Sequence, residues 1–429
     1  MPEEKMHFKD YRSGMLTNGI ERAAHRALLY STGLDREDLG KPMIAVVNSF
    51  TEMVPGHFHL RELADFVKQG IIEAGGIPRE FSTIAICDGI CQGHKGMSYP
   101  LPSRELIADS AEYMIEAHQF DGMVMLPGCD KIVPGMLMAA MRLNIPAIVI
   151  PGGPMLPGKY KDMEAITLTD MRELIGRTQT GRLTEDELMK IEEAALPGVG
   201  TCSMLGTANT MSCLAEALGM SLPGGGLAHA VSAKKRRIAK QSGRRIVAMV
   251  KEDLTPRKIM TREALRNAIR VSMAMGASTN STLHLPAIAH EAGIHITLDD
   301  FDELSREIPY LCNIKPSGQY PLSVREEQGG VPAVMKALER KLDLEQMTVS
   351  GKTVGENLAG VELVENDVIF SLDHPKKPEG GLAILHGNLA PKGAVVKQAG
   401  VKPSMHYFEG QARVFTSMEE ASWAVSNDK

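Results

Sequence analysis

The sequence contains no long apolar segment. Its richest apolar region, residues 123–155, is interrupted by Asp130, Lys131 and Arg142, so no stretch reaches the roughly 18 uninterrupted apolar residues of a membrane-spanning helix. The first ten residues, MPEEKMHFKD, are polar and lack the apolar core of a signal peptide. These absences predict a cytoplasmic protein that does not bind membranes.

An excess of positive charge is also absent. The chain has 47 Lys and Arg residues against 53 Asp and Glu residues, which leaves a net charge of −6. A mildly acidic chain has no general attraction to nucleic acid or to an anionic membrane. We therefore expect a small molecule, and not nucleic acid, as the binding partner.

Cysteine is too scarce for a secreted disulfide scaffold, because 429 residues contain only six. We expect these thiols to be buried, catalytic or bound to a metal. Aromatic residues are also few, at 4%, while methionine reaches 27, so methionine and aliphatic side chains must fill the core. The 43% hydrophobic and 23% charged residues exclude a disordered chain, and the length predicts two or three domains at roughly 150 residues each.

Short apolar runs alternate with amphipathic segments over the first 155 residues. We expect strands at PMIAVVNS (42–49), FSTIAIC (81–87), GMVMLPG (122–128) and PAIVIPGG (146–153), with helices between them. Continuous apolar strands separated by amphipathic helices indicate a parallel sheet covered by helices on both faces. The fold class is therefore α/β.

The rest of the chain is predicted to be mainly helical and to end in a β-rich unit. An acidic helix begins with a capping-box pattern at Thr184 and ends at Ala195, and residues 230–310 have helical patterns. The polar segment HPKKPEGG (374–381) is typical of a linker. We expect short strands in GLAILHGNLAPKGAVV (381–396) and ARVF (412–415).

These patterns predict two domains. Residues 1–373 would form the α/β domain. Residues 374–429 would form a linker and the first part of a β-rich C-terminal domain, which is too short to be complete.

Polar residues, thiols or glycines lie at the carboxyl end of each predicted strand. Ligands of open parallel sheets bind beyond the carboxyl ends of the strands. The residues at these ends are Asn48-Ser49, Cys87-Asp88-Gly89, Gly128-Cys129-Asp130-Lys131 and Gly152-Gly153. The sequence therefore predicts that two carboxylates, a lysine and at least one thiol face one crevice.

Cys129-Asp130-Lys131 is the strongest candidate site, because a helix amino terminus that favours anions follows directly. The alternative is a solvated Asp-Lys turn beside a buried cysteine, and Asp88 on the neighbouring strand favours the functional interpretation. Cys202 lies in the glycine-rich loop GVGTCSMLGT, whose main-chain N–H groups could bond the sulfides of an iron–sulfur cluster. This loop does not fit the dinucleotide pattern GxGxxG, and no strand precedes it.

Other cysteines and histidines have simpler explanations. Cys87 and Cys91 form C-x3-C, an unusual spacing for zinc; either could contact a cluster, although buried free cysteines are commoner. Cys213 and Cys312 lie in helical or apolar stretches and are expected in the core. The pair His57-x-His59 could mimic a metal pair, but we favour a structural role.

A basic run, KKRR at residues 234–237, could suggest nucleic acid binding. It has no interleaved aromatic residues and belongs to an acidic chain, so a solvated helix face is the favoured interpretation. Composition and spacing thus indicate a metal-dependent lyase or hydrolase, and they name no substrate.

Longer motifs of the sequence indicate a protein family. The segments are CDGI, GHKGMSYPLPSRELIADS, CDKIVPGMLMAAMRLNIP, GTANTM, DDFDELS, KPSG, GGVPAVM and GNLAPKGAVVKQAGV. From about Tyr11 to the last residues, the chain closely resembles the dihydroxy-acid dehydratase family, whose relatives are the sugar-acid and phosphogluconate dehydratases.

The resemblance implies a hydro-lyase that converts a 2,3-dihydroxy acid into a 2-keto acid. The substrate would be 2,3-dihydroxy-3-methylbutanoate or its 3-methylpentanoate homologue, in valine and isoleucine biosynthesis. The family uses an iron–sulfur cluster and Mg²⁺, and a homodimer is expected. By motif position, Cys129 and Cys202 would bind the cluster, Asp88 and Asp130 would bind magnesium, and a carbamylated Lys131 would be a further magnesium ligand.

Three features depart from the family pattern. Gly56 stands where some members have a further cluster cysteine, so the cluster could be of the 4Fe–4S or the 2Fe–2S type. Met204-Leu205-Gly206 replaces a usual Gly-Met-Phe, so a sugar-acid dehydratase is an alternative. The family's serine base would lie beyond Lys429, so we expect a C-terminally truncated chain, for which a non-catalytic scaffold is a further alternative.

Overall fold

The protein is described by a computed structural model that covers residues 11–364 and 366–427. The chain divides into two compact units, Met1–Ala399 and Gly400–Lys429. Within the described residues, no helix has the length and apolar character needed to cross a membrane.

A four-stranded parallel sheet forms the centre of the first unit. Its strands are β1 (Met43–Asn48), β2 (Ile77–Ser82), β3 (Gly122–Leu126) and β4 (Ala147–Val149), in the order β2-β1-β3-β4. Every residue of β1 and β3 is buried, as their continuous apolar runs predict, so both faces of these strands are covered. The predicted α/β fold with a parallel sheet is confirmed.

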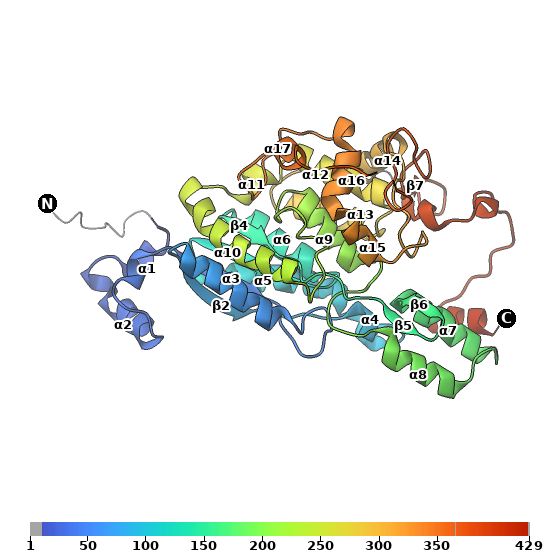
Figure 1. Cartoon of the computed structure of the whole chain (residues 1–429), viewed down its shortest axis with the longest axis horizontal. Helices are drawn as coiled ribbons and strands as arrows, with labels where there is room; N and C mark the ends of the chain where they lie inside the picture. Colours follow the sequence, from blue (N-terminus) through green and yellow to red (C-terminus); the bar gives the residue numbers. More distant parts are fainter. Residues whose placement is uncertain (1–10, 365, 428–429) are drawn as a thin grey trace. The chain divides into compact units, whose positions relative to one another are not determined.

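Helices follow the strands along the chain. They are α3 (Leu60–Glu73), α4 (Asp88–Cys91), α5 (Pro100–Ala117) and α6 (Ile132–Leu143). The later helix α10 (Ala233–Glu252) lies alongside α3 (Figure 1). Two glycines allow this approach: a Cβ on Gly70 would lie 2.0 Å from the carbonyl oxygen of Lys240, and one on Gly243 would lie 2.2 Å from that of Val67.

One predicted strand is misplaced. The expected strand at 81–87 is wrong, since β2 begins at Ile77 and ends at Ser82. Asn48, the last residue of β1, pairs with Ser82, so the residues that follow have no strand beside them. The polar residues of β2 are tolerated because it is one of the two edge strands of the sheet.

The remaining segments are mostly helical, as predicted for residues 230–310. The other helices of this unit are α1 (Gly14–Thr17), α2 (Ala23–Ser31), α7 (Leu168–Gln179), α8 (Glu185–Ala195), α9 (Thr207–Ala217), α11 (Pro256–Ile259), α12 (Arg262–Met275), α13 (Ser281–His290), α14 (Leu298–Glu307), α15 (Leu322–Glu327), α16 (Gly330–Ala337) and α17 (Val354–Leu358). At the start of the predicted acidic helix, now α8, the Thr184 side chain accepts a hydrogen bond from the N–H of Glu187.

The helices α7 and α8 share a small separate core with the hairpin β5 (Gly158–Tyr160) and β6 (Met163–Ile166).

The C-terminal region contains less β structure than expected. The predicted strands within 381–396 form an antiparallel hairpin of β7 (Ala383–Leu385) and β8 (Ala394–Val396). The predicted strand at 412–415 is wrong, because this segment has no regular secondary structure. The only α-helix of the second unit, within its described residues, is α18 (Met418–Ser426). The proposed domain boundary between residues 373 and 374 stays a prediction.

Candidate functional site

Four loops meet beyond the carboxyl ends of the sheet strands. The backbone N–H of Gly200 donates to the carbonyl oxygen of Pro55 at 2.9 Å, and the N–H of Thr201 donates to that of Gly153 at 2.9 Å. The N–H of Gly152 donates to Pro127 at 2.8 Å. The loops after β1, β3 and β4 are thereby joined to the glycine-rich loop that contains Cys202.

Gly56 lies against Cys129 and against Thr201, the residue before Cys202. A Cβ atom at this position would lie 3.0 Å from the Sγ of Cys129 and 3.1 Å from the Cγ2 of Thr201. Any side chain here would have to displace the thiol or the loop next to Cys202. The glycine therefore permits the close approach of these two loops.

His57 holds the Cys129 loop through its backbone. The ring is fully buried, and its Nε2 accepts the N–H of Cys129 at 2.8 Å. Because Nε2 accepts, the proton of the neutral ring is on Nδ1, which lies 2.8 Å from the carbonyl oxygen of Ser49. Burial lowers the pKa of His57 to about 4, so the ring is neutral at physiological pH.

His59 has a similar backbone role. Its Nε2 lies 2.9 Å from the carbonyl oxygen of Gly152. The two histidines therefore hold different loops of this edge, and these backbone contacts agree with the structural interpretation favoured for His57 and His59.

Three thiols gather at this edge. Cys129 is buried in the loop before α6, and its thiol is within hydrogen-bonding reach of the Cys87 thiol. This hydrogen bond lowers the pKa of Cys87 to about 6 and raises that of Cys129. Burial, followed by the nearby charges of Asp130 and Cys87, raises the pKa of Cys202 to about 12. The Cys129 thiol is thus the donor of this hydrogen bond, and the Cys87 thiolate is the acceptor.

The sequence analysis favoured an ordinary buried cysteine at Cys87, although contact with a cluster was left open. Its position directly before Asp88 could have indicated that it belongs to the site. In contrast, Cys213 and Cys312 are fully buried in the hydrophobic core, as predicted.

Lys131 lies between the two predicted magnesium ligands. Its Nζ donates to the Oδ2 of Asp88 and lies 3.5 Å from the Oδ2 of Asp130. Asp88 is the first residue of α4, and Lys131 directly precedes α6. Burial, reinforced by the charge of Asp88, raises the pKa of Asp130 to about 6. The structure therefore brings the three residues together as expected.

The donor set fits a magnesium ion. The Oδ1 of Asp88 is buried and has no hydrogen-bond partner, which is costly unless a cation or a water completes the site. Mg²⁺ favours one or two carboxylates together with water and substrate oxygens. No three His, Cys, Asp or Glu side chains among residues 11–364 and 366–427 are arranged around a single ion. A carbamate on Lys131 would supply a third oxygen ligand at this place.

The three thiols fit an iron–sulfur cluster by their chemistry. Cluster irons take cysteine thiolates as ligands. Thiolates that bind separate iron atoms need not converge on one point, so the set is compatible with the absence of a single-ion site. Three cysteines would leave one iron of a four-iron cluster without a protein ligand.

Asn209 shapes the glycine-rich loop that contains Cys202. From the first turn of α9, its Nδ2 donates to the carbonyl oxygen of Met204 at 2.8 Å and also to that of Cys202. Its Oδ1 accepts the hydroxyl of Thr201 at 2.7 Å. The motif GTANTM thus contains a residue that positions Cys202 through the backbone, a role that the sequence pattern did not predict.

Thr207 connects Asp130 to a distant segment. It begins α9 and hydrogen-bonds to the Asp130 carboxylate. Its Oγ1 accepts the side-chain amide of Asn280 at 2.8 Å and lies 2.8 Å from the hydroxyl of Ser278. This contact between segments over 70 residues apart could not be anticipated from local sequence.

Lys235 departs from the prediction of a solvated basic helix face. Its side chain is fully buried, and its Nζ donates to the carbonyl oxygens of Pro151 and Gly225, each at 2.7 Å. Its neighbours in the run do face the surface, where Lys234 pairs with Glu326. Lys235 therefore supports the loop after β4, and the prediction is wrong for this residue.

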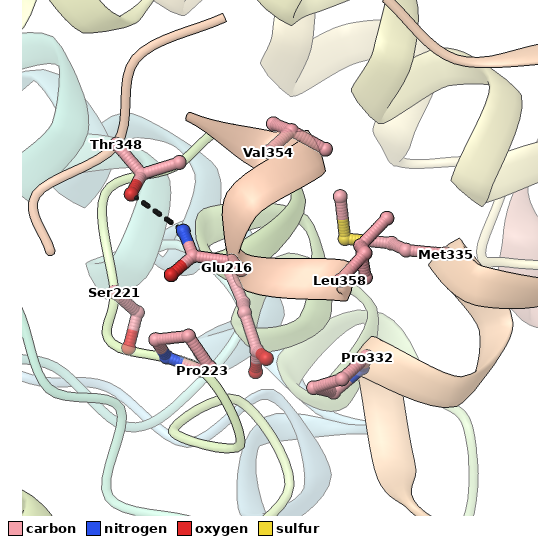
Figure 2. A pocket seen from close by; sticks show the side chains of 9 residues that line it. Glu216, Ser221, Pro223, Pro332, Met335, Thr348, Val354 and Leu358 are labelled. Carbon is pink, nitrogen blue, oxygen red and sulfur yellow. Dashed lines mark hydrogen bonds between the residues drawn. The ribbon is translucent and has the colours of Figure 1, made fainter. Parts of the chain in front are cut away.

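A small cavity lies at the opposite end of α9 (Figure 2). Its volume is about 30 Å³, and apolar side chains such as Pro332 and Leu358 line it together with Glu216. The Glu216 carboxylate accepts the N–H groups of Gly224 at 2.6 Å and Gly226 at 2.8 Å. The cavity is far smaller than the roughly 300 Å³ or more of a small-molecule site, so it is too small to be a substrate site.

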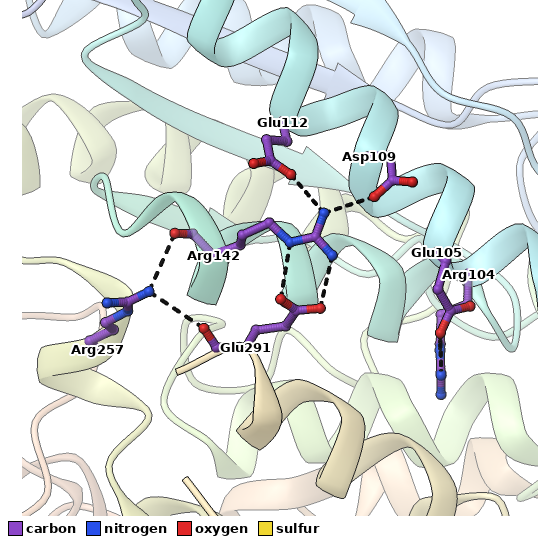
Figure 3. Close-up of polar contacts among 7 residues, drawn as sticks. All are labelled: Arg104, Glu105, Asp109, Glu112, Arg142, Arg257 and Glu291. Atoms are coloured by element: carbon purple, nitrogen blue, oxygen red, sulfur yellow. Dashed lines mark hydrogen bonds and ion pairs between the residues drawn. The ribbon is translucent and has the colours of Figure 1, made fainter. Parts of the chain in front are cut away.

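The far end of α6 is tied to its neighbours by Arg142 (Figure 3). The guanidinium of Arg142 donates to Asp109 at 2.8 Å and Glu112 at 2.6 Å on α5, and to Glu291 at 2.8 Å, directly after α13. These contacts raise the pKa of Arg142 above its ordinary value, with Glu291 contributing most. The helix that follows Lys131 is therefore held by ion pairs at its other end.

Two family profiles match the chain. The profile described as Dihydroxy-acid/6-phosphogluconate dehydratase N-terminal matches residues 41–357, and the corresponding C-terminal profile matches residues 367–429. Similar curated proteins include the dihydroxy-acid dehydratase of Methanosarcina barkeri, which is 54% identical over 414 residues. The enzyme of the same name from Halothermothrix orenii is 52% identical over 417 residues. The alignments cover 96% and 97% of this chain, and 75% and 76% of those relatives.

Proposed function

Because the chain belongs to the dihydroxy-acid/6-phosphogluconate dehydratase family, we propose that it is a dihydroxy-acid dehydratase of branched-chain amino acid biosynthesis. The observation that carries this function is 52–54% identity to dihydroxy-acid dehydratases over 96–97% of the chain. The substrate is 2,3-dihydroxy-3-methylbutanoate or its 3-methylpentanoate homologue.

The reaction removes one water molecule. The C2–H bond breaks and its proton goes to a base, while the C3–O bond breaks and the hydroxyl leaves with its electron pair. The electron pair of the C2–H bond forms the C2–C3 double bond, and the enol then tautomerises to the 2-keto acid. When bound, a cluster with an open iron and Mg²⁺ supply Lewis acids for the leaving hydroxyl and for the substrate carboxylate and 2-hydroxyl.

Cys129 and Cys202 are the proposed cluster ligands, and Cys87 is the third. This assignment is supported by the hydrogen bond between Cys87 and Cys129 and by the effect of the Cys87 charge on Cys202. His57 and Asn209 orient Cys129 and Cys202 through backbone hydrogen bonds. A three-cysteine set favours a 4Fe–4S cluster with one iron open to substrate.

Asp88, Asp130 and a carbamylated Lys131 are the proposed magnesium ligands. The unpartnered Oδ1 of Asp88 and the position of Lys131 between the two carboxylates support this assignment. An unmodified ammonium would repel the cation, whereas a carbamate provides an anionic oxygen. Thr207 holds Asp130 through its hydroxyl.

The direct experiment is a substrate comparison. Full-length protein, purified without oxygen and supplied with iron, sulfide and Mg²⁺, should form 2-keto acid from 2,3-dihydroxy-3-methylbutanoate. A panel of aldonates tests the second candidate, a sugar-acid dehydratase, which the segment Met204-Leu205-Gly206 favours. Turnover confined to aldonates would overturn the first function, and cluster retention without any turnover would indicate a scaffold.

We expect the enzyme to act in the cytoplasm as a homodimer. All six cysteines are free thiols, as in a reducing compartment. The helix α2 buries none of its residues, and Ile20 and Leu28 in this region are 91% and 69% exposed, so a second copy could cover this face. Light scattering on the purified protein measures the oligomeric state.

A further inference from the structure

Lys235 occupies a position that is unfavourable for a lysine. It is the third residue of α10, and its N–H donates to the side chain of the N-cap residue Ser232 at 3.1 Å. The helix dipole opposes a positive charge in the first turn, and the fully buried side chain also loses its hydration. An apolar side chain would avoid both costs. What Lys235 provides in return is two hydrogen bonds, to the carbonyl oxygens of Pro151 and Gly225.

The two acceptors belong to separate segments of the chain. Pro151 lies in the β4 loop (residues 150–155), which directly follows β4. Gly225 lies in the PGGG loop (residues 223–226), which follows α9. The Nζ of Lys235 is 2.7 Å from both carbonyl oxygens. One buried amino group therefore bonds the β4 loop to the PGGG loop.

The PGGG loop is itself anchored to α9. The peptide between Gly225 and Gly226 accepts Lys235 at its carbonyl oxygen, and its N–H donates to the Glu216 carboxylate at 2.8 Å. The N–H of Gly224 donates to the same carboxylate at 2.6 Å. Because Glu216 is buried on α9, Lys235 connects the β4 loop to a part of the fold that is held by packing.

A further segment packs on the β4 loop. A Cβ on Gly153 would lie 2.2 Å from the carbonyl oxygen of Ala228, and the φ of Gly153 is +91°, which favours glycine. The N–H of Ala230 donates to the carbonyl oxygen of Pro154 at 3.1 Å. The residues between the PGGG loop and α10 therefore hold the β4 loop along its length.

The β4 loop in turn aligns Thr201, the residue before Cys202. The N–H of Thr201 donates to the carbonyl oxygen of Gly153 at 2.9 Å, and its own carbonyl oxygen accepts the N–H of Met155 at 2.7 Å. Thr201 is thereby paired in parallel with Pro154. Both backbone polar groups of Thr201 are bonded to the β4 loop, so this loop determines where the chain enters Cys202.

The same pairing sets the distance between two thiols of the site. Thr201 lies on one side of Gly56 and Cys129 on the other, since a Cβ on Gly56 would be 3.1 Å from the Cγ2 of Thr201 and 3.0 Å from the Sγ of Cys129. A shift of the β4 loop would move Thr201 away from this contact. The position of Cys202 relative to Cys129 therefore depends on the β4 loop.

We propose that Lys235 is a positioning residue for Cys202: it fixes the β4 loop, and the β4 loop fixes the main chain in front of the thiol. Without Lys235, the carbonyl oxygens of Pro151 and Gly225 lose this donor, and the loop has to rearrange to satisfy them. Lys235 acts through the backbone and not by contact with the reacting atoms. This inference rests on the cluster that the proposed function assigns to Cys202.

Hydrogen exchange of the purified protein tests the loop without measuring activity. Lys235→Met keeps a long side chain and removes the donors. The amides of Met155 and Thr201 should exchange at least about tenfold faster in this variant than in the wild type, because the pairing between them opens more easily. Lys234→Met is the matched control, since Lys234 is at the surface, where it pairs with Glu326, and its exchange should equal that of the wild type. Amides of α12 serve as the reference for global stability.

Loss of the cluster to an iron chelator tests the effect on Cys202. In protein purified without oxygen, Lys235→Met should lose the visible absorption about tenfold faster than the wild type, because residues that orient a metal ligand commonly contribute this much. Lys235→Gln retains an N–H donor and should show an intermediate rate, whereas Lys234→Met should match the wild type. If Lys235→Met does not fold, Lys235→Gln decides, and a rate equal to that of the wild type overturns the proposal.

The two measurements separate the steps of the proposal. Faster exchange at Met155 and Thr201 together with faster cluster loss supports it. Unchanged exchange, or exchange raised equally in α12, overturns the specific role of Lys235 in the β4 loop. Faster local exchange with an unchanged rate of cluster loss means that the loop does not position Cys202. A wild type without cluster absorption overturns the cluster and this inference together, while the dehydratase function is still judged by its substrate assay.

Discussion

The Nε2 atom of His57 accepts the backbone N–H of Cys129 at 2.8 Å. The two residues are far apart in the chain, and this bond fixes the loop in front of α6. The same ring also bonds to Ser49, directly after β1. The position of Cys129 is therefore fixed relative to the central sheet. A rigid thiol position is what a metal ligand requires.

Replacement of His57 tests this relationship. His57→Phe leaves the buried N–H of Cys129 without an acceptor, so we expect the free energy of unfolding to fall by roughly 1–3 kcal/mol and the iron content to fall as well. His59→Phe, which loses only the contact with Gly152, should retain more iron. Thermal unfolding and iron analysis measure the two effects, and equal iron contents in both variants would contradict the prediction.

Serine variants test the three thiols at the sheet edge. Replacement of Cys87, Cys129 or Cys202 by serine should remove most of the brown colour and visible absorption of protein purified without oxygen, because each change removes a direct iron ligand. Cys213→Ser and Cys312→Ser should keep most of it. If Cys87→Ser keeps its iron and sulfide content, the third ligand is a different group; loss in all five variants would indicate general misfolding.

Lys131→Arg tests the anionic role of the lysine. Arginine stays positively charged and cannot be carbamylated, so magnesium binding and dehydration should be lost while the cluster absorption stays. In the full-length enzyme we expect a loss of about a hundredfold or more in rate, because the substrate's Lewis acid is misplaced. Lys190→Arg on the exposed face of α8 is the control. Near-normal turnover and magnesium affinity in Lys131→Arg would mean that the residue is not a ligand.

Glu216 should make stability depend on pH. Burial raises its pKa to about 7 from an ordinary value of 4.5. Between these values the folded protein holds a proton that the unfolded chain releases, so this group's contribution to the free energy of unfolding falls as pH rises. The Glu216→Gln variant cannot ionise at this position. Its free energy of unfolding, relative to that of the wild type, should therefore rise by roughly 1–3 kcal/mol between about pH 5 and about pH 7. Melting temperatures of both proteins, with the exposed Glu192→Gln as control, measure this; a constant difference between wild type and Glu216→Gln would refute it.

The sheet and most of the candidate site were predictable because their signals are local. Continuous apolar runs identify β1 and β3, and the residues at the strand ends include Cys129, Asp130 and Lys131. The strand at 81–87 was misplaced because pairing with β1, and not hydrophobicity, decides where β2 ends. The segment ARVF at 412–415 likewise forms no strand without a partner.

Other site features depend on contacts that no local pattern contains. The hydrogen bond from Arg104 of α5 to His284 of α13, for example, joins residues that are 180 positions apart. Lys235 looked like its charged neighbours, although its side chain turns inward to two backbone carbonyls. Cys87 gained its interpretation only from the contact with Cys129.

The close approach of α3 and α10 has a consequence for mutational scanning. Gly70 and Gly243 have no chemical role, yet a single methyl group at either would collide with the opposite backbone at 2.0 Å and 2.2 Å. Variants at these positions should be depleted from a selection library as strongly as variants of Cys129 or Asp88. Intolerance to substitution alone would therefore not distinguish Gly70 and Gly243 from residues of the cofactor site. The iron content of the protein that still folds would distinguish them.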